Sequence, residues 1–134
     1  LEQLVKAVGK EHVVLDLSCR KKGDSYYIVT DRWQKFTNQC LDEALMEKLH
    51  SYCDEFLVHA VNVEGTGTGV DEDLLKILAK ESEIPITYAG GIGSYEDIEK
   101  IQKTGKNRVN YTIGSALDLF GGSLKFDTIV TKYN

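Results

Sequence analysis

The sequence has little of several features that mark particular protein classes. It holds one proline and three cysteines, none in a C-x-x-C pair, so neither a disulfide framework nor a cysteine-built zinc site is expected. Its 16 lysines and arginines are outnumbered by 21 aspartates and glutamates, and the net charge of −5 argues against nucleic acid as a partner. No apolar run is long enough to span a membrane, and the first residues lack the pattern of a secretory signal. We therefore expect a soluble protein of a reducing compartment.

Length and composition predict one domain. The 134 residues are 42% hydrophobic and 28% charged, which is ordinary for a globular chain that buries a core. No low-complexity or Pro/Ser-rich linker interrupts them, so residues 1–134 are treated as a single unit. The chain does not begin with methionine, which is typical of a fragment.

Apolar, β-branched runs alternate with apolar residues at helical spacing, which predicts four βα units around a parallel sheet. The expected strands are 12–18, 56–61, 84–88 and 109–113, and an extra short strand or hairpin arm follows at 25–30 after a turn at 21–24. Asp71 and Ser94 are expected to cap helices, Gly9 and Gly105 to end them, and a last helix to span about 126–133. Two architectures fit this α/β pattern: an open doubly wound sheet, and half of a (β/α)8 barrel, whose full length is about 250 residues.

Two glycine-containing pairs stand where the third and fourth strands end. Gly90 and Gly91 follow one strand, Gly114 and Ser115 follow the next, and a helix is expected after each pair. Unpaired backbone N–H groups and the helix dipole favour an anion at such positions, although a tight turn alone also explains each pair. Because the two pairs lie at neighbouring strand ends, we predict that these four residues bind phosphate.

Asp16, Ser18 and His59 lie near the ends of the first two strands. Side chains two residues apart share a face, so Asp16 and Ser18 point the same way, and His59 comes from the adjacent strand. An ionised carboxylate at the end of an apolar strand requires a polar pocket or a partner, which makes Asp16 a candidate general acid or base. A hydrogen bond from Asp16 to the following loop explains the residue equally well. His59 has two interpretations as well, a proton-carrying site residue or a core histidine bonded to backbone.

No metal motif accompanies these residues. The H-E-x-x-H pattern, the P-loop and a dinucleotide-binding G-x-G-x-x-G are all absent, and we expect no metal site. The segment 65–69 (GTGTG), with Glu64 before it, is interpreted as an active-site loop. Tyr26, Tyr27 and Trp33 either cover a ligand or pack within the hairpin arm.

Four parts of the chain carry a family resemblance: 13–21 (VVLDLSCRK), 55–60 with 63–65 (EFLVHA, VEG), 88–91 (YAGG) and 114–122 (GSALDLFGG). Together they resemble a histidine-biosynthesis isomerase family, the eukaryotic form of phosphoribosylformimino-5-aminoimidazole carboxamide ribotide isomerase. The resemblance covers nearly all of this chain, in order, but only the C-terminal half of that family's (β/α)8 barrel. It implies a C-terminal half-barrel whose N-terminal half lies outside this sequence.

The resemblance implies an Amadori rearrangement, in which the aminoaldose ribotide ProFAR becomes the aminoketose PRFAR without metal or organic cofactor. Ring opening needs a proton on the ring oxygen and enolisation removes one from C2, so two titratable groups flank the sugar. The family's fifth-strand aspartate corresponds most simply to Asp16, whereas an alignment anchored on Arg20 places Ser18 there; Asp16 is preferred because serine is a poor general acid. His59 stands where many bacterial members have threonine, and it is the candidate to orient the sugar or move protons.

Half a barrel leaves two sheet edges and an inner face open, and we expect that face to be apolar. The chain is therefore expected to pair with the complementary N-terminal half-barrel or with itself. The first-strand aspartate and the second phosphate site of the family are absent, so the fragment alone is expected to be an incomplete enzyme. Two alternatives remain: the cyclase subunit of imidazole glycerol phosphate synthase, and a non-catalytic half-barrel that binds phosphate ligands. The expected location is the cytoplasm, or a plastid for a plant-like source.

Overall fold

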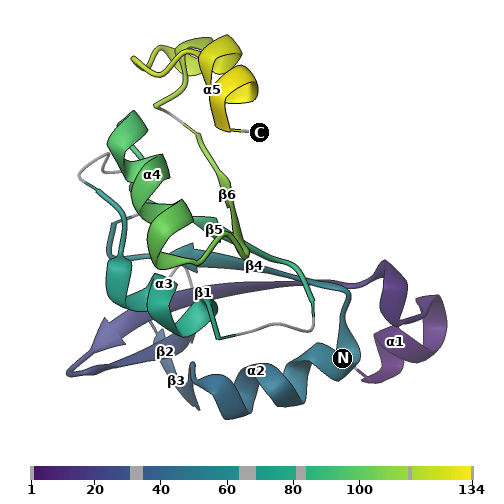
Figure 1. Ribbon diagram of the computed structural model, residues 1–134. Helices are drawn as coiled ribbons and strands as arrows, with labels where there is room; N and C mark the ends of the chain where they lie inside the picture. The colour runs from purple at the N-terminus through teal and green to yellow at the C-terminus, as the bar shows by residue number, and fades with distance from the viewer. Residues whose placement is uncertain (1, 31–34, 64–68, 81–83, 115, 134) are drawn as a thin grey trace.

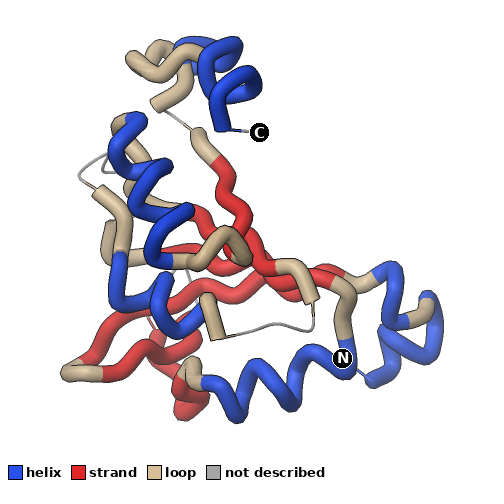
Figure 2. The backbone as a smooth tube through the Cα atoms, viewed as in Figure 1, coloured by secondary structure: helices blue, strands red, loops and turns tan. Residues whose placement is uncertain are grey.

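A six-stranded sheet with the order β3-β2-β1-β4-β5-β6 forms the centre of the molecule (Figure 1, Figure 2). The computed structural model describes residues 2–30, 35–63, 69–80, 84–114 and 116–133. The strands are β1 (Val14–Lys22), β2 (Ser25–Thr30), β3 (Lys35–Cys40), β4 (Glu55–Ala60), β5 (Ile86–Ala89) and β6 (Val109–Thr112).

Strands β1, β4, β5 and β6 run parallel and lie in chain order, which confirms the four expected βα units. A doubly wound sheet reverses its strand order at a switch point, whereas a barrel adds each new strand on the same side of the last one. The sequential order of these strands is therefore that of half a (β/α)8 barrel.

The β1–β2–β3 arm is an antiparallel extension of this parallel sheet. β1 pairs with β2 from Cys19↔Ile28 to Lys22↔Ser25, and β2 pairs with β3. The turn expected at 21–24 is wrong in its first half, because pairing with β2 keeps residues 21 and 22 in the strand and only 23 and 24 turn. The sequence pattern does not predict β3, whose residues are mostly polar; pairing with β2 makes that segment a strand.

The helices are α1 (Glu2–Val8), α2 (Glu43–Leu49), α3 (Glu72–Leu78), α4 (Tyr95–Thr104) and α5 (Phe126–Tyr133), with 3-10 turns at Lys10–His12, His50–Tyr52 and Asp118–Phe120. The expected caps are confirmed: Asp71 caps α3, and Ser94 with Asp97 forms a reciprocal capping box on α4. Gly9, with φ 87°, follows the end of α1, and Gly105 follows the end of α4. None of the described helices has the length and hydropathy that crossing a membrane requires.

The core lies between one face of the sheet and the helices packed on it. Alternate strand residues on this covered face are completely buried, among them Phe56 and Val58 of β4 and Tyr88 of β5. The apolar helix residues in the same core are Met46, Leu74, Leu75, Leu78, Ile98 and Ile101. We call this side of the sheet the covered face.

The other side of the parallel strands, the open face, carries the intervening residues. We expected an apolar surface here, and that expectation is wrong for most of its described positions, which include Asp16, Ser18, Glu55, His59, Thr87, Asn110 and Thr112. Val14, which is 55% exposed, the half-buried Leu57 and the buried Ala89 are the apolar exceptions. The strand period of two sends the polar residues of these strands to this side, away from the core.

Candidate functional site

Asp16 and His59 are in contact on the open face. β1 and β4 are adjacent parallel strands in a register that sets Ser18 opposite His59, so Asp16, Ser18 and His59 share one face. The Nε2 atom of His59 lies 3.0 Å from Oδ1 of Asp16. The Asp16 side chain is 60% exposed and that of His59 is 22% exposed, so the carboxylate is open to solvent on the side of the sheet that none of the described helices covers.

This geometry gives the pair acid–base capacity. A carboxylate at hydrogen-bond distance from one ring nitrogen fixes the orientation of the imidazole and favours a proton on that nitrogen. An imidazole and a carboxylate in contact are groups that can serve as general acid and base. The sequence places His59 on the strand next to that of Asp16. In the structure the two side chains are in contact, and Ser18 lies opposite His59 across the β1–β4 ladder.

The ends of β1 and β4 are tied together just beyond this pair. The Asn62 side-chain Oδ1 accepts a hydrogen bond from the Lys21 backbone N–H at 2.9 Å, and the Val61 N–H donates to the Cys19 carbonyl at 3.1 Å. These bonds hold the connection after β4 against the end of β1, and they fix the strand ends that flank the Asp16–His59 pair.

Gly90 and Gly91 allow two connections to approach each other closely. Both have positive φ, 142° and 76°, and a Cβ on Gly91 would lie 2.0 Å from the Gly69 carbonyl oxygen. The Gly69 N–H donates to the Gly91 carbonyl at 3.0 Å. A Cβ on Gly90 would lie 3.0 Å from Ala60 at the end of β4. Backbone packing between strand ends therefore explains this glycine pair by itself.

The start of α4 already holds an anion, the carboxylate of Asp97. Asp97 is 7% exposed, and its Oδ2 accepts hydrogen bonds from the Gly93 N–H at 2.9 Å and the Ser94 N–H at 3.1 Å. The sequence predicts the cap at Ser94, but not that the Asp97 carboxylate uses these two donors. Because these two N–H groups are already used, a phosphate at this strand end would have to accept its hydrogen bonds from backbone N–H groups before residue 93.

Gly114 differs from Gly91 in having open space around it. Its φ is not positive, a Cβ there would meet nothing within 4 Å, and its carbonyl accepts from the Leu117 N–H at 3.0 Å. β5 and β6 pair with Ala89 opposite Thr112, so Gly90 and Gly114 lie at neighbouring strand ends as expected. Ser115, the fourth predicted phosphate ligand, lies outside the described residues.

Tyr26 has a structural contact that the sequence does not reveal. It is 3% exposed, and its hydroxyl donates to Oδ1 of Asp71 at 2.5 Å. The same Oδ1 accepts the Leu74 N–H that caps α3, and the Asp71 N–H donates to the hydroxyl of buried Tyr88 at 2.9 Å. Burial, followed by this hydrogen bond, raises the pKa of Tyr26. Tyr26 therefore anchors the hairpin arm to the start of α3 and does not cover a ligand.

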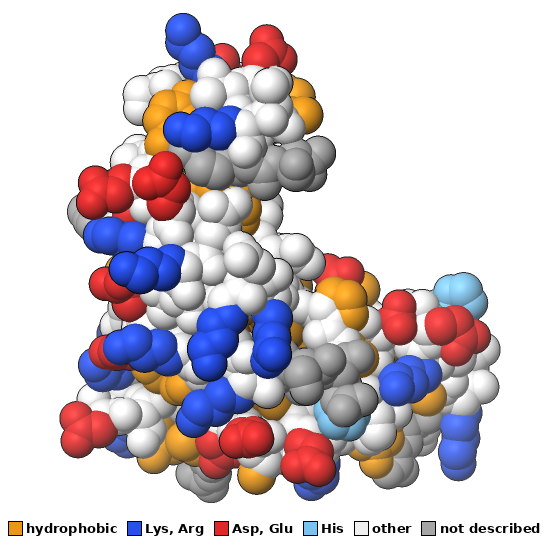
Figure 3. All heavy atoms as spheres, in the orientation of Figure 1, with side chains coloured by type: hydrophobic (Ala, Val, Ile, Leu, Met, Phe, Trp, Pro, Cys, Tyr) orange, Lys and Arg blue, Asp and Glu red, His pale blue; other side chains and the backbone are white. Residues whose placement is uncertain are grey.

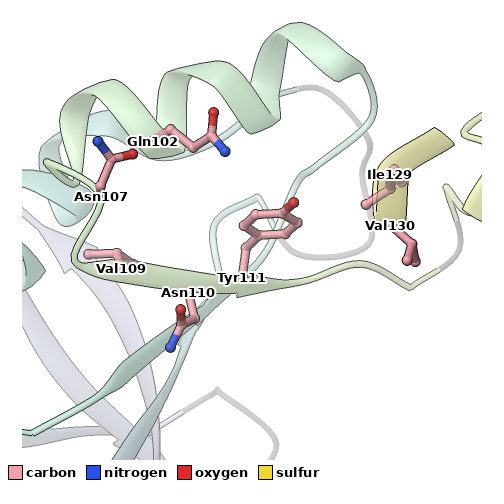
Figure 4. Close-up of a pocket in the computed structure, with 7 residues that line it drawn as sticks. All are labelled: Gln102, Asn107, Val109, Asn110, Tyr111, Ile129 and Val130. Atoms are coloured by element: carbon pink, nitrogen blue, oxygen red, sulfur yellow. The ribbon is translucent and has the colours of Figure 1, made fainter. Parts of the chain in front are cut away.

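A cavity of about 440 Å³ lies apart from this site, between α4, β6 and α5 (Figure 4). Its lining consists of Gln102, Asn107, Val109, Asn110, Tyr111, Ile129 and Val130. In Figure 4 Tyr111 points from β6 toward α4, whereas Asn110 points to the other side of the strand. Among the described lining residues, Tyr111 is the one with an acid–base side chain, and we place no chemistry there.

The remaining expectations concern cysteines, metals and the 65–69 loop. All three cysteines are free thiols, and burial raises the pKa of Cys19 to about 12, which makes it a poor nucleophile. Within the described ranges no group of three or more potential ligands is arranged to hold a metal ion. Glu64, the segment 65–68 and Trp33 lie outside the described residues.

Comparison with known proteins identifies relatives of the chain. The family described as Histidine biosynthesis protein matches residues 1–124. A protein of Medicago truncatula, named a chloroplastic 1-(5-phosphoribosyl)-5-((5-phosphoribosylamino)methylideneamino)imidazole-4-carboxamide isomerase, is 54% identical over 134 residues, which are 100% of this chain and 43% of the relative. Isomerases of the same name from Yarrowia lipolytica and Saccharomyces cerevisiae are 42% and 40% identical over 91% and 95% of this chain, and over 48% and 51% of their own lengths.

The chain thus spans about half the length of the curated relatives it matches. Four parallel βα units in sequential order are also half of the eight in a (β/α)8 barrel. Length and topology therefore agree on the expected half-barrel.

Proposed function

The chain belongs to the histidine biosynthesis protein family, and from that premise we propose that it is the C-terminal half of an isomerase that rearranges the aminoaldose ribotide ProFAR into the aminoketose PRFAR. The observation that carries the proposal is the Asp16–His59 pair, whose Oδ1 and Nε2 atoms lie 3.0 Å apart on two adjacent parallel strands, with His59 next to the carboxyl end of β4. Catalytic groups of (β/α)8 enzymes lie at this end of the barrel. The names of the relatives, which are 40% to 54% identical, support the same reaction.

The pair supplies the acid of an Amadori rearrangement. A proton delivered to the ribose ring oxygen breaks the bond between that oxygen and C1 and leaves an iminium at C1. Removal of the proton from C2 then gives an enolamine, which tautomerises to the ketone. In this proposal the Asp16–His59 pair donates the first proton, Ser18 binds a sugar hydroxyl, and a carboxylate from the other half of the barrel takes the C2 proton.

One phosphate of the substrate is proposed to bind at the ends of β5 and β6. Backbone N–H groups of Gly90, Gly91, Gly114 and Ser115 would be the donors, since Asp97 already uses those of Gly93 and Ser94. The relatives' printed name contains two phosphoribosyl groups, and the second phosphate falls to the other half of the barrel.

The partner is proposed to be the complementary N-terminal half-barrel, and residues 1–134 are proposed to be a single C-terminal unit. Two open strand edges in the described part of the chain support this. β6 pairs with β5 alone, and β2 pairs with β1 only from Cys19 onward, which leaves one edge of Val14–Ser18 without a strand neighbour. Unpaired edges of this kind are sites where a further strand adds.

The test is turnover of ProFAR by this chain alone, by a separately produced N-terminal half from a relative, and by their mixture. We expect activity in the mixture alone, because the second acid–base group and the second phosphate site come from the other half. Ammonia-dependent cyclisation of PRFAR by the mixture would transfer the assignment to the cyclase of the same pathway. Confirmed association without either activity would leave a phosphate-binding half-barrel without catalysis.

For location we propose a plastid. The name of the 54% identical relative includes the word chloroplastic, which favours the plastid among the two locations expected from the sequence. A fluorescent fusion of the complete protein that stays in the cytoplasm of a plant cell would overturn this part of the proposal.

A further inference from the structure

A second hollow, of about 430 Å³, opens on the helical side of the molecule. Its lining combines the end of α3, the end of α4, the turn before β6 and the start of α2, and consists of Glu43, Lys76, Ala79, Lys80, Thr104, Lys106 and Arg108. Crossover helices run antiparallel to their strands, so the ends of α3 and α4 lie toward the amino ends of the parallel strands. None of the described lining residues belongs to the Asp16–His59 pair or to the glycines that follow β5 and β6, so the hollow is separate from the candidate site.

Four cations converge on this hollow. Among the described lining residues, Lys76, Lys80, Lys106 and Arg108 face one carboxylate, that of Glu43, although the whole chain has a net charge of −5. Among the described residues, none of the four cations is within ion-pair distance of a carboxylate. Figure 3 shows Lys and Arg side chains gathered over α3 and the lower end of α4. Like charges held this close repel each other, and a bound anion relieves that repulsion.

Cations are favoured at the carboxyl ends of helices, but this effect explains only some of the four cations. Lys76 lies in the last turn of α3, where a cation is favoured by the helix dipole. Arg108 lies beyond α4, immediately before β6, so no helix end requires it. The turn that carries it is unusual: Lys106 and Asn107 are consecutive non-glycine residues with positive φ, 54° and 59°. The Arg108 N–H donates to the Gly105 carbonyl at 3.0 Å and closes this turn, so the backbone itself sets where the two cations stand.

We propose that this hollow binds a small anion with two or more phosphate groups. Its volume falls within the range of small-molecule pockets, and Thr104 and Glu43 add a hydroxyl and a carboxylate for the remaining polar groups of such a ligand. A membrane or a nucleic acid fits less well, because both present extended negative surfaces to a chain that is acidic overall. Position separates this site from the substrate phosphate site proposed above, and neither proposal depends on the other.

Tripolyphosphate is the probe, and its binding to the 134-residue chain is measured by isothermal titration calorimetry at low ionic strength. We expect the double variant Lys80→Ala/Arg108→Ala to weaken binding by about 10-fold or more, since two charge-assisted contacts are lost. The matched control, Lys6→Ala/Lys48→Ala, removes the same charge from two cations that do not line the hollow and should change the affinity by about 2-fold or less. Glu43→Gln should tighten binding by about 2-fold to 5-fold, because it removes the carboxylate that faces the ligand.

Each contrary result is decisive. Equal losses in the double variant and in its control would show general charge attraction and overturn the site. An unchanged affinity in Lys80→Ala/Arg108→Ala would place the tripolyphosphate elsewhere, at the strand-end glycines for example. Absence of binding to the unaltered chain at millimolar tripolyphosphate would overturn the proposal outright. All the substituted side chains are exposed, so these variants should fold like the parent.

Discussion

The two faces of the six-residue strand β4 serve different purposes: the covered face contributes to the core, and the open face carries a residue of the candidate site. Phe56 and Val58 are 0% exposed and belong to the core, whereas Leu57 and His59, which alternate with them, are partly exposed on the other side. Because successive strand residues point to opposite faces, the core requires nothing of His59, and the Asp16–His59 pair requires nothing of the core. This comparison predicts that substitutions on one face will change folding while those on the other change activity.

The largest expected effect on activity comes from Asp16→Asn, tested in the complemented enzyme. Loss of the transferable proton should lower kcat by about 100-fold to 10,000-fold, the usual contribution of general acid–base catalysis, with little change in KM. Asp24→Asn, the same chemical change in the exposed turn of the hairpin, is the control and should leave turnover near normal. Steady-state kinetics measures the loss of activity, and thermal unfolding of each variant shows whether stability has changed as well. Near-normal turnover of Asp16→Asn would move the acid role to Ser18 or His59.

The largest expected effect on folding comes from Phe56→Ala on the covered face. Emptying this fully buried site should cost about 3–5 kcal/mol of unfolding free energy. Leu57→Ala, one residue along on the open face, should cost about 1 kcal/mol in the isolated chain, because Leu57 is only partly buried there. Urea denaturation of the isolated chain measures both. Equal losses would mean that the two faces are not distinct in the way the burial pattern indicates.

A smaller loss is expected from Gly91→Ala at the end of β5. A Cβ at this site would stand 2.0 Å from the Gly69 carbonyl oxygen, and φ of 76° is unfavourable for alanine, so we expect a cost of about 2 kcal/mol or more. Gly114→Ala is the matched control, since open space surrounds that glycine and its φ is not positive. It should change stability by about 0.5 kcal/mol or less. A tolerated Gly91→Ala would show that the two connections are not held as closely as their hydrogen bond indicates.

Local signals in the sequence predict much of the fold. The bounds of α5, the caps at Asp71 and Ser94 and the order of the four parallel strands all follow from nearby residues. β3 is missed because its segment lacks a β-branched or alternating apolar run, and only its pairing with β2 makes it extended. The polar open face is missed because the expectation treats the strands as apolar on both sides, whereas their alternation sends the polar residues to one side.

The candidate site follows the same division between local and tertiary information. Asp16 and His59 are predicted as neighbours because strand adjacency and side-chain period suffice to bring them together. The close approach of Gly69 to Gly91 depends on a connection from another strand, and no sequence spacing encodes it. Likewise, the bond from Tyr26 to Asp71 joins residues 45 positions apart, so the tyrosine looks like any other aromatic of a hairpin.

Tyr26→Phe tests whether the buried hydroxyl of Tyr26, on the covered side of the sheet, contributes to the stability of the fold. The substitution keeps the ring and removes the hydroxyl that donates to Asp71, and it should cost about 1–2 kcal/mol at neutral pH. The pKa of Tyr26 is raised in the folded chain above its usual value of about 10, so the stability it contributes is complete below that pH. That stability is lost as the pH rises toward the folded-state pKa, because the unfolded chain ionises first.

The unaltered chain should therefore lose stability more steeply above about pH 10 than Tyr26→Phe, so the gap between them should narrow as the pH rises. Cys19, whose pKa is raised to about 12, adds a similar slope above its ordinary value of 9.0, but it is present in both proteins and cancels in the comparison. Urea denaturation at several pH values from 7 to 11 measures the gap. Tyr27→Phe, at the neighbouring position of β2, is the control and should keep the parental slope. A difference in unfolding free energy that stays constant with pH would mean that folding does not hold the Tyr26 hydroxyl in its protonated form. The hydroxyl on the covered side would then be as open to solvent as the Asp16–His59 pair on the open face.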